Sequence, residues 1–321
     1  TITKDSTFTV VGTDTKGCQN TASKTITKID LPVLSYTGNT SICYGESTRI
    51  TVSGGSSYNW GSVSGSSLSV TPKQDTTLTV IGTMQGCSST LDIPITVKAL
   101  PSVYISGVDA ICFGDVATLT AHGADTYLWN DAANSTTNSI SVSPLYTSIY
   151  RVIGTATNGC SSDAEITLTV NSLPVISINA ANAICYGNNA SLTASGATTY
   201  IWNGNIPGAN YQPTITKDST FTVVGTDNNN CQSSATKTIT KINLPSLSFT
   251  GKDAVCLGEN TRIIVTGAST YRWNDNSIGN MASITPSQDT LISVTGTMQG
   301  CSSTLDIPIT VKALPSVYIS G

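Results

Sequence analysis

Nine cysteines are the residues of this sequence whose type and spacing point most directly to chemistry. Eight of them alternate between two kinds of turn, first Cys-x-Gly and then a second cysteine that follows a Gly- or Asn-containing turn. In chain order they are Cys43 and Cys87, Cys112 and Cys160, Cys185 and Cys231, and Cys256 and Cys301. None has the Cys-x-x-Cys spacing typical of zinc sites. The pattern therefore predicts disulfides, formed in an oxidising compartment, with Cys18 left over at the start of the chain.

The other reactive side chains do not gather into a catalytic pattern. The single histidine, His122, stands beside Gly123, where we expect an exposed loop, and one histidine cannot supply a base to several repeats. Carboxylates are scattered, no Gly-rich loop opens a helix, and Asn274-Asp275-Asn276 lacks the ligand density of a calcium loop. The sequence predicts no enzyme, no bound metal and no cofactor.

These cysteines are placed by an internal repeat. Leu-Pro recurs at Leu31, Leu100, Leu173, Leu244 and Leu314, and a Tyr-x-Trp follows each first cysteine at constant spacing. The repeat predicts modules at 31–99, 100–172, 173–243 and 244–313, preceded by the C-terminal half of a module at 1–30 and followed by the first strand of another at 314–321. Residues 1–14 are identical to 214–227, and residues 83–107 to 297–321, so a block of three modules is itself repeated.

Within a module the residue pattern is that of β-strands. Stretches such as 117–121 and 166–170 alternate apolar and polar residues and are rich in Thr, Val and Ile, and turn residues arrive every eight to twelve positions. About seven short strands with one tryptophan predict an all-β, immunoglobulin-like sandwich of two sheets. Because a single residue, Ala313, separates the last strand of one module from the next Leu-Pro, we expect a tandem array in an elongated rod, at roughly 35 Å per module.

Two disulfide pairings fit this arrangement. Pairing within each module would close loops of about 45 residues and stabilise each by about 4 kcal/mol. However, the first cysteine falls in the turn after strand one and the second in the turn after strand six, and these turns lie at opposite ends of such a sandwich. The alternative joins neighbouring modules through Cys43–Cys160, Cys112–Cys231 and Cys185–Cys301, and leaves Cys18, Cys87 and Cys256 for modules outside this sequence. The sequence leaves both pairings open.

The four tryptophans occur once in each module at fixed spacing. We interpret Trp60, Trp129, Trp202 and Trp273 as core anchors, each burying a large apolar area, in preference to a sugar-stacking surface.

Composition narrows the class of partner. Charged residues make up 11% of the chain and the net charge is −4, with 15 basic residues thinly spread, which argues against nucleic acid. No run of about 18 apolar residues predicts a membrane span. The chain opens in what reads as the middle of a strand, so we expect both ends to be cuts through a longer protein that carries any export signal elsewhere.

Taken in order, Leu-Pro, Ile/Val-Cys-x-Gly, Tyr-x-Trp and Gly/Asn-Cys before a Thr/Val-rich strand resemble the immunoglobulin-like repeats of giant Bacteroidetes surface proteins. The resemblance covers essentially the whole sequence and extends to SprB-type gliding-motility adhesins. It implies export by the type IX secretion system, an extracellular location at the cell surface, and a filament that acts mechanically in adhesion and gliding. Its partners would be neighbouring modules and, through the full-length protein, an external surface or polysaccharide.

An Asp-Ser/Thr pair precedes the sixth strand in most modules. We interpret it as a tight turn in which the Asp bonds its own backbone. The pair also resembles O-glycan attachment sites of Bacteroidetes secreted proteins, which would be Ser6, Thr76, Ser219 and Thr290. Module 100–172 departs from the pattern, with Thr147-Ser148.

Two other functions fit the same sequence. The array could be a non-adhesive stalk that presents a distal enzyme or carbohydrate-binding domain, or the modules could bind glycans themselves. A functional domain beyond the ends would favour the first alternative, and exposed tryptophans would favour the second.

Overall fold

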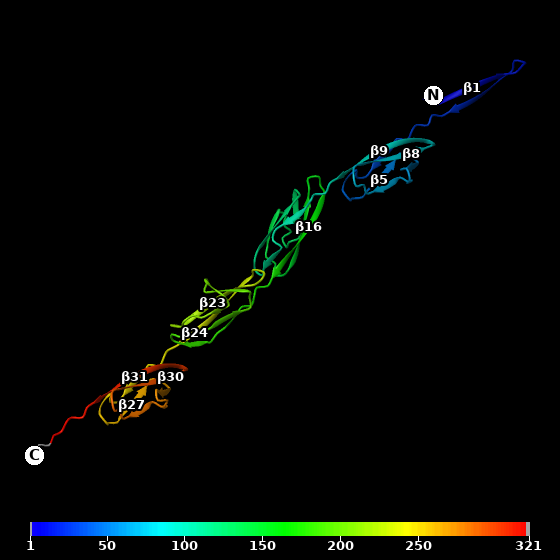
Figure 1. The fold of residues 1–321 in the computed structure, drawn as a ribbon. Coiled ribbons are helices and arrows are strands. Elements are labelled where there is room, and N and C mark those ends of the chain that lie inside the picture. The colour runs from blue at the N-terminus through cyan, green and yellow to red at the C-terminus, as the bar shows by residue number, and fades with distance from the viewer. Residues whose placement is uncertain (1, 319–321) are drawn as a thin grey trace. The chain divides into compact units, whose positions relative to one another are not determined.

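The computed structural model describes residues 2–318, and every regular element in that range is a β-strand (Figure 1). The chain divides into two compact units, the first ending at Val170 and the second beginning at Asn171. Each unit holds two modules, and the first unit also holds a two-stranded hairpin. No described helix is long and apolar enough to cross a membrane.

In the first unit, the hairpin is β1 (Ser6–Thr13) and β2 (Gln19–Ile26). The strands of the first module are β3 (Ser35–Thr37), β4 (Ser41–Cys43), β5 (Thr48–Ser53), β6 (Ser57–Asn59), β7 (Ser67–Val70), β8 (Thr76–Met84) and β9 (Cys87–Lys98). Those of the second module are β10 (Tyr104–Ser106), β11 (Ala110–Cys112), β12 (Ala117–His122), β13 (Thr126–Trp129), β14 (Ser139–Val142), β15 (Ser148–Thr155) and β16 (Ser161–Asn171), whose last residue falls just past the unit boundary.

In the second unit, the third module consists of β17 (Ser177–Asn179), β18 (Ala183–Cys185), β19 (Leu192–Ser195), β20 (Thr199–Trp202), β21 (Ile206–Pro207), β22 (Asn210–Tyr211), β23 (Ser219–Thr226) and β24 (Gln232–Ile242). The fourth module consists of β25 (Ser248–Thr250), β26 (Ala254–Cys256), β27 (Thr261–Thr266), β28 (Thr270–Trp273), β29 (Met281–Ile284), β30 (Thr290–Met298) and β31 (Cys301–Lys312).

Each module is a sandwich of two sheets. In the fourth module one sheet has the order β25-β27-β29 and the other β26-β31-β30-β28, and the remaining modules repeat this order, with β21 added to the second sheet of the third. Buried residues from both sheets meet in one core, as Leu192 of β19, Trp202 of β20 and Val223 of β23 do. Two sheets of mainly antiparallel strands packed over a shared core are the immunoglobulin-like arrangement. The chain is therefore an all-β array of immunoglobulin-like sandwiches, as the repeat predicts.

The hairpin at the start of the chain shows how much these strands depend on the rest of a module. Residues 1–14 are identical to 214–227, yet Phe8 and Val10 of β1 are 56% and 66% exposed, whereas Phe221 and Val223 of β23 are 6% and 0% exposed. In the third module, side chains of β19 and β20 pack against the apolar face of β23, whereas β1 pairs with β2 alone. The same sequence is therefore buried only where the other strands of a module cover it.

A glycine in the sixth strand lets the start of each module lie close to it. A Cβ at Gly225 would lie 2.4 Å from Cδ1 of Ile176, and Gly82, Gly154 and Gly296 meet the equivalent apolar side chains at similar distances. A serine of the seventh strand then binds the carbonyl of the Leu-Pro proline, as Ser162 Oγ does to Pro101 at 2.6 Å. These contacts fix where the chain begins each sandwich.

The tyrosine two residues before each tryptophan closes the turn before its own strand. Tyr200 Oη accepts the Ala197 N–H and donates to the Ala197 carbonyl, both at 2.7 Å. The same pair of bonds joins Tyr58 to Gly55, Tyr127 to Ala124 and Tyr271 to Ala268.

We expect Tyr200→Phe to lower the free energy of unfolding of the third module by about 1–2 kcal/mol, because both partners lie in a half-buried turn. Hydrogen exchange of the β23 and β24 amides would measure the loss. Tyr186→Phe is the matched control in the same module, since its ring is half exposed and its hydroxyl makes no hydrogen bond to the described residues. Equal effects of the two substitutions would contradict this role.

Candidate functional site

Disulfides join successive modules within each unit. Cys43 of the first module is bonded to Cys160 of the second, with their Cα atoms 5.7 Å apart, and Cys185 of the third is bonded to Cys301 of the fourth, at 5.6 Å. We refer to these two bonds as the staples. Cys112 and Cys231 are disulfide-bonded as well. The free cysteines of residues 2–318 are Cys18, Cys87 and Cys256.

Pairing of the cysteines within modules, the first of the two alternatives, is wrong for both staples. Cys43 is not bonded to Cys87, Cys160 is not bonded to Cys112, Cys185 is not bonded to Cys231, and Cys301 is not bonded to Cys256.

The physical reason is the register of the second and seventh strands. Cys43 of β4 lies beside Lys98, the last residue of β9, whereas Cys87 is the first residue of that strand. The extended chain from Cys87 to Lys98 separates the two ends by about 36 Å. A disulfide requires Cα atoms within about 7 Å, so the cysteines of one module cannot meet.

The first cysteine of each module is held by a four-residue turn. The carbonyl of Cys43 accepts the Glu46 N–H at 2.9 Å, and the Glu46 carboxylate accepts the Cys43 N–H at 2.8 Å. Gly45, the third residue of the turn, has φ +85°, a conformation that favours glycine. The turn recurs in every module, with Glu, Asp or Asn as its last residue, and it fixes the cysteine at the end of the second strand.

The same turn in the fourth module carries an ion pair. Lys252 Nζ lies 2.8 Å from Glu259 Oε1, and Glu259 Oε2 accepts the Cys256 N–H at 3.1 Å. The Lys252 bond and the Cys256 N–H lower the pKa of the Glu259 carboxyl, so the carboxylate beside the free thiol keeps its charge to a more acidic pH.

The second cysteine follows the hairpin between the sixth and seventh strands. In the fourth module Met298 pairs with Cys301 across a two-residue loop, in which Gln299 and Gly300 have φ +52° and +79°. Positive φ at both central residues is the geometry of tight hairpins. Residues 297–312 are identical to 83–98, yet Cys301 is 1% exposed and the unbonded Cys87 is half-buried. The staple partner accounts for the difference.

Polar contacts surround the first staple. Lys98 Nζ, at the end of the first module, donates to the Asn158 carbonyl at 3.0 Å, and Asn158 Nδ2 donates to the Ala99 carbonyl at 2.9 Å. The Asn158 side-chain oxygen also accepts the Cys160 N–H at 2.9 Å. The hairpin that carries Cys160 is thereby bound to the linker between the two modules, so the disulfide and the linker lie side by side.

A regular spacing that the sequence-based predictions did not use accompanies the staples. The interval from the second cysteine of a module to the first cysteine of the next has the same length at every occurrence, and we call it the constant interval. Its occurrences are Cys18 to Cys43, Cys87 to Cys112, Cys160 to Cys185 and Cys231 to Cys256.

The interval within a module is not constant in this way. It is shortest from Cys43 to Cys87 and longest from Cys112 to Cys160. The constant interval consists of a seventh strand, the linker and the first two strands of the next module, whereas the variable one contains the loops. The constant length therefore reflects the absence of variable loops from this stretch of the chain, which connects one staple to the next.

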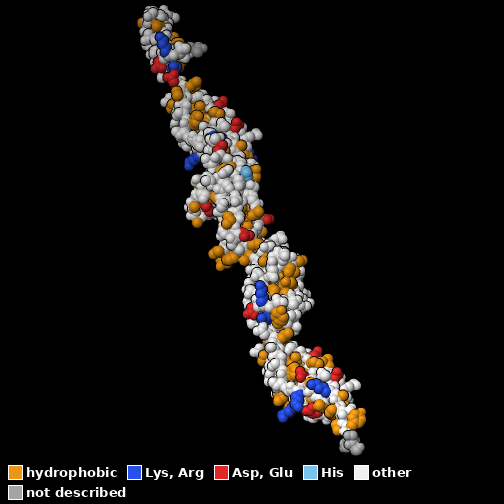
Figure 2. All heavy atoms as spheres, turned by 90° about the vertical axis from the view of Figure 1, so that its left-hand side faces the viewer, with side chains coloured by type: hydrophobic (Ala, Val, Ile, Leu, Met, Phe, Trp, Pro, Cys, Tyr) orange, Lys and Arg blue, Asp and Glu red, His pale blue; other side chains and the backbone are white. Residues whose placement is uncertain are grey.

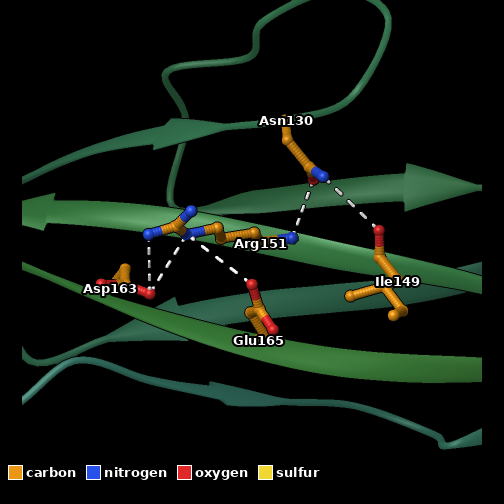
Figure 3. A network of polar contacts seen from close by, with 5 residues as sticks. All are labelled: Asn130, Ile149, Arg151, Asp163 and Glu165. Carbon is orange, nitrogen blue, oxygen red and sulfur yellow. Dashed lines mark hydrogen bonds and ion pairs between the residues drawn. The ribbon is translucent and has the colours of Figure 1, made fainter.

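Charged side chains are scattered in small groups over the surface (Figure 2). The group around Arg151 is drawn in Figure 3: its guanidinium lies 3.1 Å from Asp163 and 3.8 Å from Glu165, while Asn130 accepts the Arg151 N–H. All three charged side chains are about half exposed, so these pairs contribute roughly 0–1 kcal/mol. Among residues 2–318 no group of three or more metal-ligating side chains occurs.

His122 is the last residue of β12 and is not in a loop, contrary to our expectation. Its ring stacks on Tyr104 with centroids 4.8 Å apart, and Nε2 lies 2.8 Å from Ser106 Oγ. Tyr104 and Ser106 belong to β10, which pairs with β12, so these contacts join two strands of one sheet.

Three tryptophans are buried in their module cores. Trp129, Trp202 and Trp273 are 1%, 0% and 3% exposed, and each indole N–H donates to a backbone carbonyl. Trp60 is half-buried against the core of the first module. This burial leaves three of the four rings without a face for sugar stacking.

The Asp of the Asp-Ser/Thr pairs binds far along the chain and does not bond its own turn. Asp218 Oδ1 accepts the Lys241 N–H at 2.7 Å, and Asp75 and Asp289 accept the equivalent N–H of β9 and β31. In the hairpin, Asp5 accepts the N–H of Lys28, two residues after β2. In the second module Thr147 Oγ1 accepts the Val170 N–H at 3.1 Å. In the second module a threonine hydroxyl therefore takes the place of the aspartate carboxylate as the hydrogen-bond acceptor.

We expect Asp218→Ala to destabilise the third module by about 1–3 kcal/mol, because it leaves the Lys241 N–H without its charged acceptor. Asp218→Thr should recover much of the loss, since Thr147 makes the same bond in the second module. Exchange of the Lys241 amide with solvent would measure both effects. An alanine variant as protected as the native chain would rule out this role.

The four hydroxyls proposed as glycan sites follow these acceptors. Ser6, Thr76, Ser219 and Thr290 are half-buried, and Ser219 Oγ donates to the Lys217 carbonyl at 3.0 Å. Their modification stays a prediction, which mass spectrometry of the native protein would check.

No family model and no curated protein matches the chain. Solved structures of tandem domains are similar at low identity. Titin domains I67–I69 share 11% identity over 66% of this chain and 99% of theirs, with a TM-score of 0.33. A Ca²⁺-stabilised adhesin with which an Antarctic bacterium binds ice shares 12% identity over 87% of this chain and 99% of its own (TM-score 0.30), and Sidekick-1 immunoglobulin domains 1–4 share 12% over 89% and 97% (TM-score 0.23). The fold assignment rests on the sheet topology.

Proposed function

We propose that this chain is a segment of an extracellular cell-surface filament that acts mechanically, holding a cell to an external surface. The observation that carries the proposal is the Cys43–Cys160 bond, which joins two folded modules across their linker. A bond between modules resists their separation, which matters when the array is under tension. Disulfides of this kind persist in oxidising locations outside the cytosol.

The pattern of the staples supports extension along the array. Cys43 and Cys185 are first cysteines, and each is bonded to the second cysteine of the following module. By the same rule we propose that Cys112 is bonded to Cys231. Non-reducing peptide mapping of the exported protein should recover these three cross-links and none within a module, and a Cys112–Cys160 or Cys185–Cys231 peptide would contradict the rule.

We further propose that the filament is an adhesin of the gliding type, exported by type IX secretion. The sequence motifs support this assignment by resemblance. Labelling of intact cells with an antibody against the array should detect the protein at the surface, and deletion of its gene should reduce attachment under flow and the speed of gliding. Retention of the protein inside the cell would overturn the proposed location.

The non-adhesive stalk makes a different prediction in the same cells. If the array only holds a distal domain away from the cell, exchanging these modules for unrelated ones of equal length should preserve attachment. If these modules themselves bear the load, the exchange should weaken attachment under flow while leaving static binding intact.

A further inference from the structure

We propose that the staples and the constant intervals between them form a covalent strap, which carries tension past the folded modules and limits how far the chain can extend. The proposal deepens the mechanical function above and rests on it. Its partner is a pulling force along the array, delivered through the neighbouring modules.

The strap follows a short route through the chain. Tension that reaches Cys43 crosses the first staple to Cys160, runs along the constant interval to Cys185, and crosses the second staple to Cys301. The intervening residues, 44–159 and 186–300, lie outside this route. Their modules could unfold without lengthening it, because a disulfide fixes the distance between the chain segments that it joins.

The route has little slack even when the modules are folded. The constant interval from Cys160 to Cys185 reaches at most about 83–90 Å when fully extended. The last strand of the second module, β16, and the last strand of the third, β24, have 11 residues each and rise about 36 Å apiece. Two modules pulled end to end thus use most of the available length.

The staples also change which bonds bear the load inside a module. In the fourth module, tension arriving through the linker enters β25 and β26 and must cross to β31 through three parallel residue pairs, from Ala254↔Thr310 to Cys256↔Lys312. The second staple instead delivers it to Cys301, the first residue of β31. The load then runs along the covalent backbone of one strand and spares the hydrogen bonds between strands.

Stretching single molecules of the full chain, held by thiol-free tags at its two termini, would test the strap. With both staples the shortest covalent route runs from residue 1 to Cys43, from Cys160 to Cys185, and from Cys301 to residue 321. The oxidised chain should therefore extend to about 320 Å and stop. The reduced chain should extend to about 1,150 Å as its modules unfold. The expected ratio is roughly 3.5-fold.

Two variants make the test specific. Cys43→Ser removes the first staple and should raise the oxidised limit to at least about 640 Å, because the route must then follow the chain through unfolded modules. Cys87→Ser removes a free thiol and should leave the limit of the oxidised chain at about 320 Å. An oxidised native chain that passes well beyond this limit before rupture, or a Cys43→Ser chain that does not lengthen, would overturn the strap.

The two proposals fail in different experiments. A chain that is inextensible when oxidised but is found inside the cell would retain the strap and lose the surface function. A surface protein whose oxidised chain extends freely would retain the surface function and lose the strap.

Discussion

Replacing Trp202 by alanine is expected to lower the free energy of unfolding of the third module by about 3–5 kcal/mol. The ring is fully buried, lies 5.9 Å from the Tyr211 ring centroid, and donates its indole N–H to the Gly208 carbonyl at 3.0 Å. Alanine would leave a large cavity between the two sheets and strand that carbonyl. In a module of about 70 residues this loss is a large part of the total stability.

Hydrogen exchange under native conditions would measure the effect, because amides of β23 and β24 exchange through unfolding of their own module. Trp60→Ala provides the comparison, since the half-buried Trp60 fills less of its core and should cost less. Unchanged protection of β23 and β24 in the Trp202 variant would show that the ring does not anchor the core.

Removing the first staple is also expected to cause a large loss of stability. Cys43→Ser should destabilise the first two modules by about 4–5 kcal/mol, because a link between residues 117 apart restricts the unfolded chain strongly on the entropy model of cross-linking. Thermal unfolding of the oxidised chain, followed through exchange of the β15 and β16 amides, would report the loss.

Cys87→Ser is the matched control, because Cys87 is also half-buried but has no disulfide partner within residues 2–318. Its effect should stay within about 1 kcal/mol, as for most substitutions away from buried contacts. If the two serine variants unfold alike, or if a reducing agent does not abolish their difference, the staple does not stabilise the modules.

The class of fold could be predicted from the sequence because the signals are local. Period-two alternation, Gly and Asn at turns and one Tyr-x-Trp in each module follow from the geometry of neighbouring residues, and these are the features that define the strands. The repeat predicts the number of modules in the same way. No contact between distant residues was needed.

The cysteine pairing required the tertiary structure. Along the sequence Cys43 is nearer to Cys87 than to Cys160, whereas the parallel register of β4 with the end of β9 places Cys43 and Cys87 at opposite ends of a module. The expected order of the strands argued against pairing within a module, but the choice between the two pairings could not be made without that register. The constant interval can be counted in the sequence. That it consists of extended strands without variable loops is known only from the structure.

The hydrogen-bond partners of Asp218 and Thr147 also required the tertiary structure. Their residue types fit a turn, and a turn is where they lie, but the N–H groups that they bind lie 23 residues further along the chain. What the sequence by itself determined is the repeating all-β module with its tryptophan, because those signals depend on neighbours along the chain. Which cysteines meet, and which carboxylate binds which strand, only the tertiary structure decided, because these contacts depend on where the two ends of an extended strand lie.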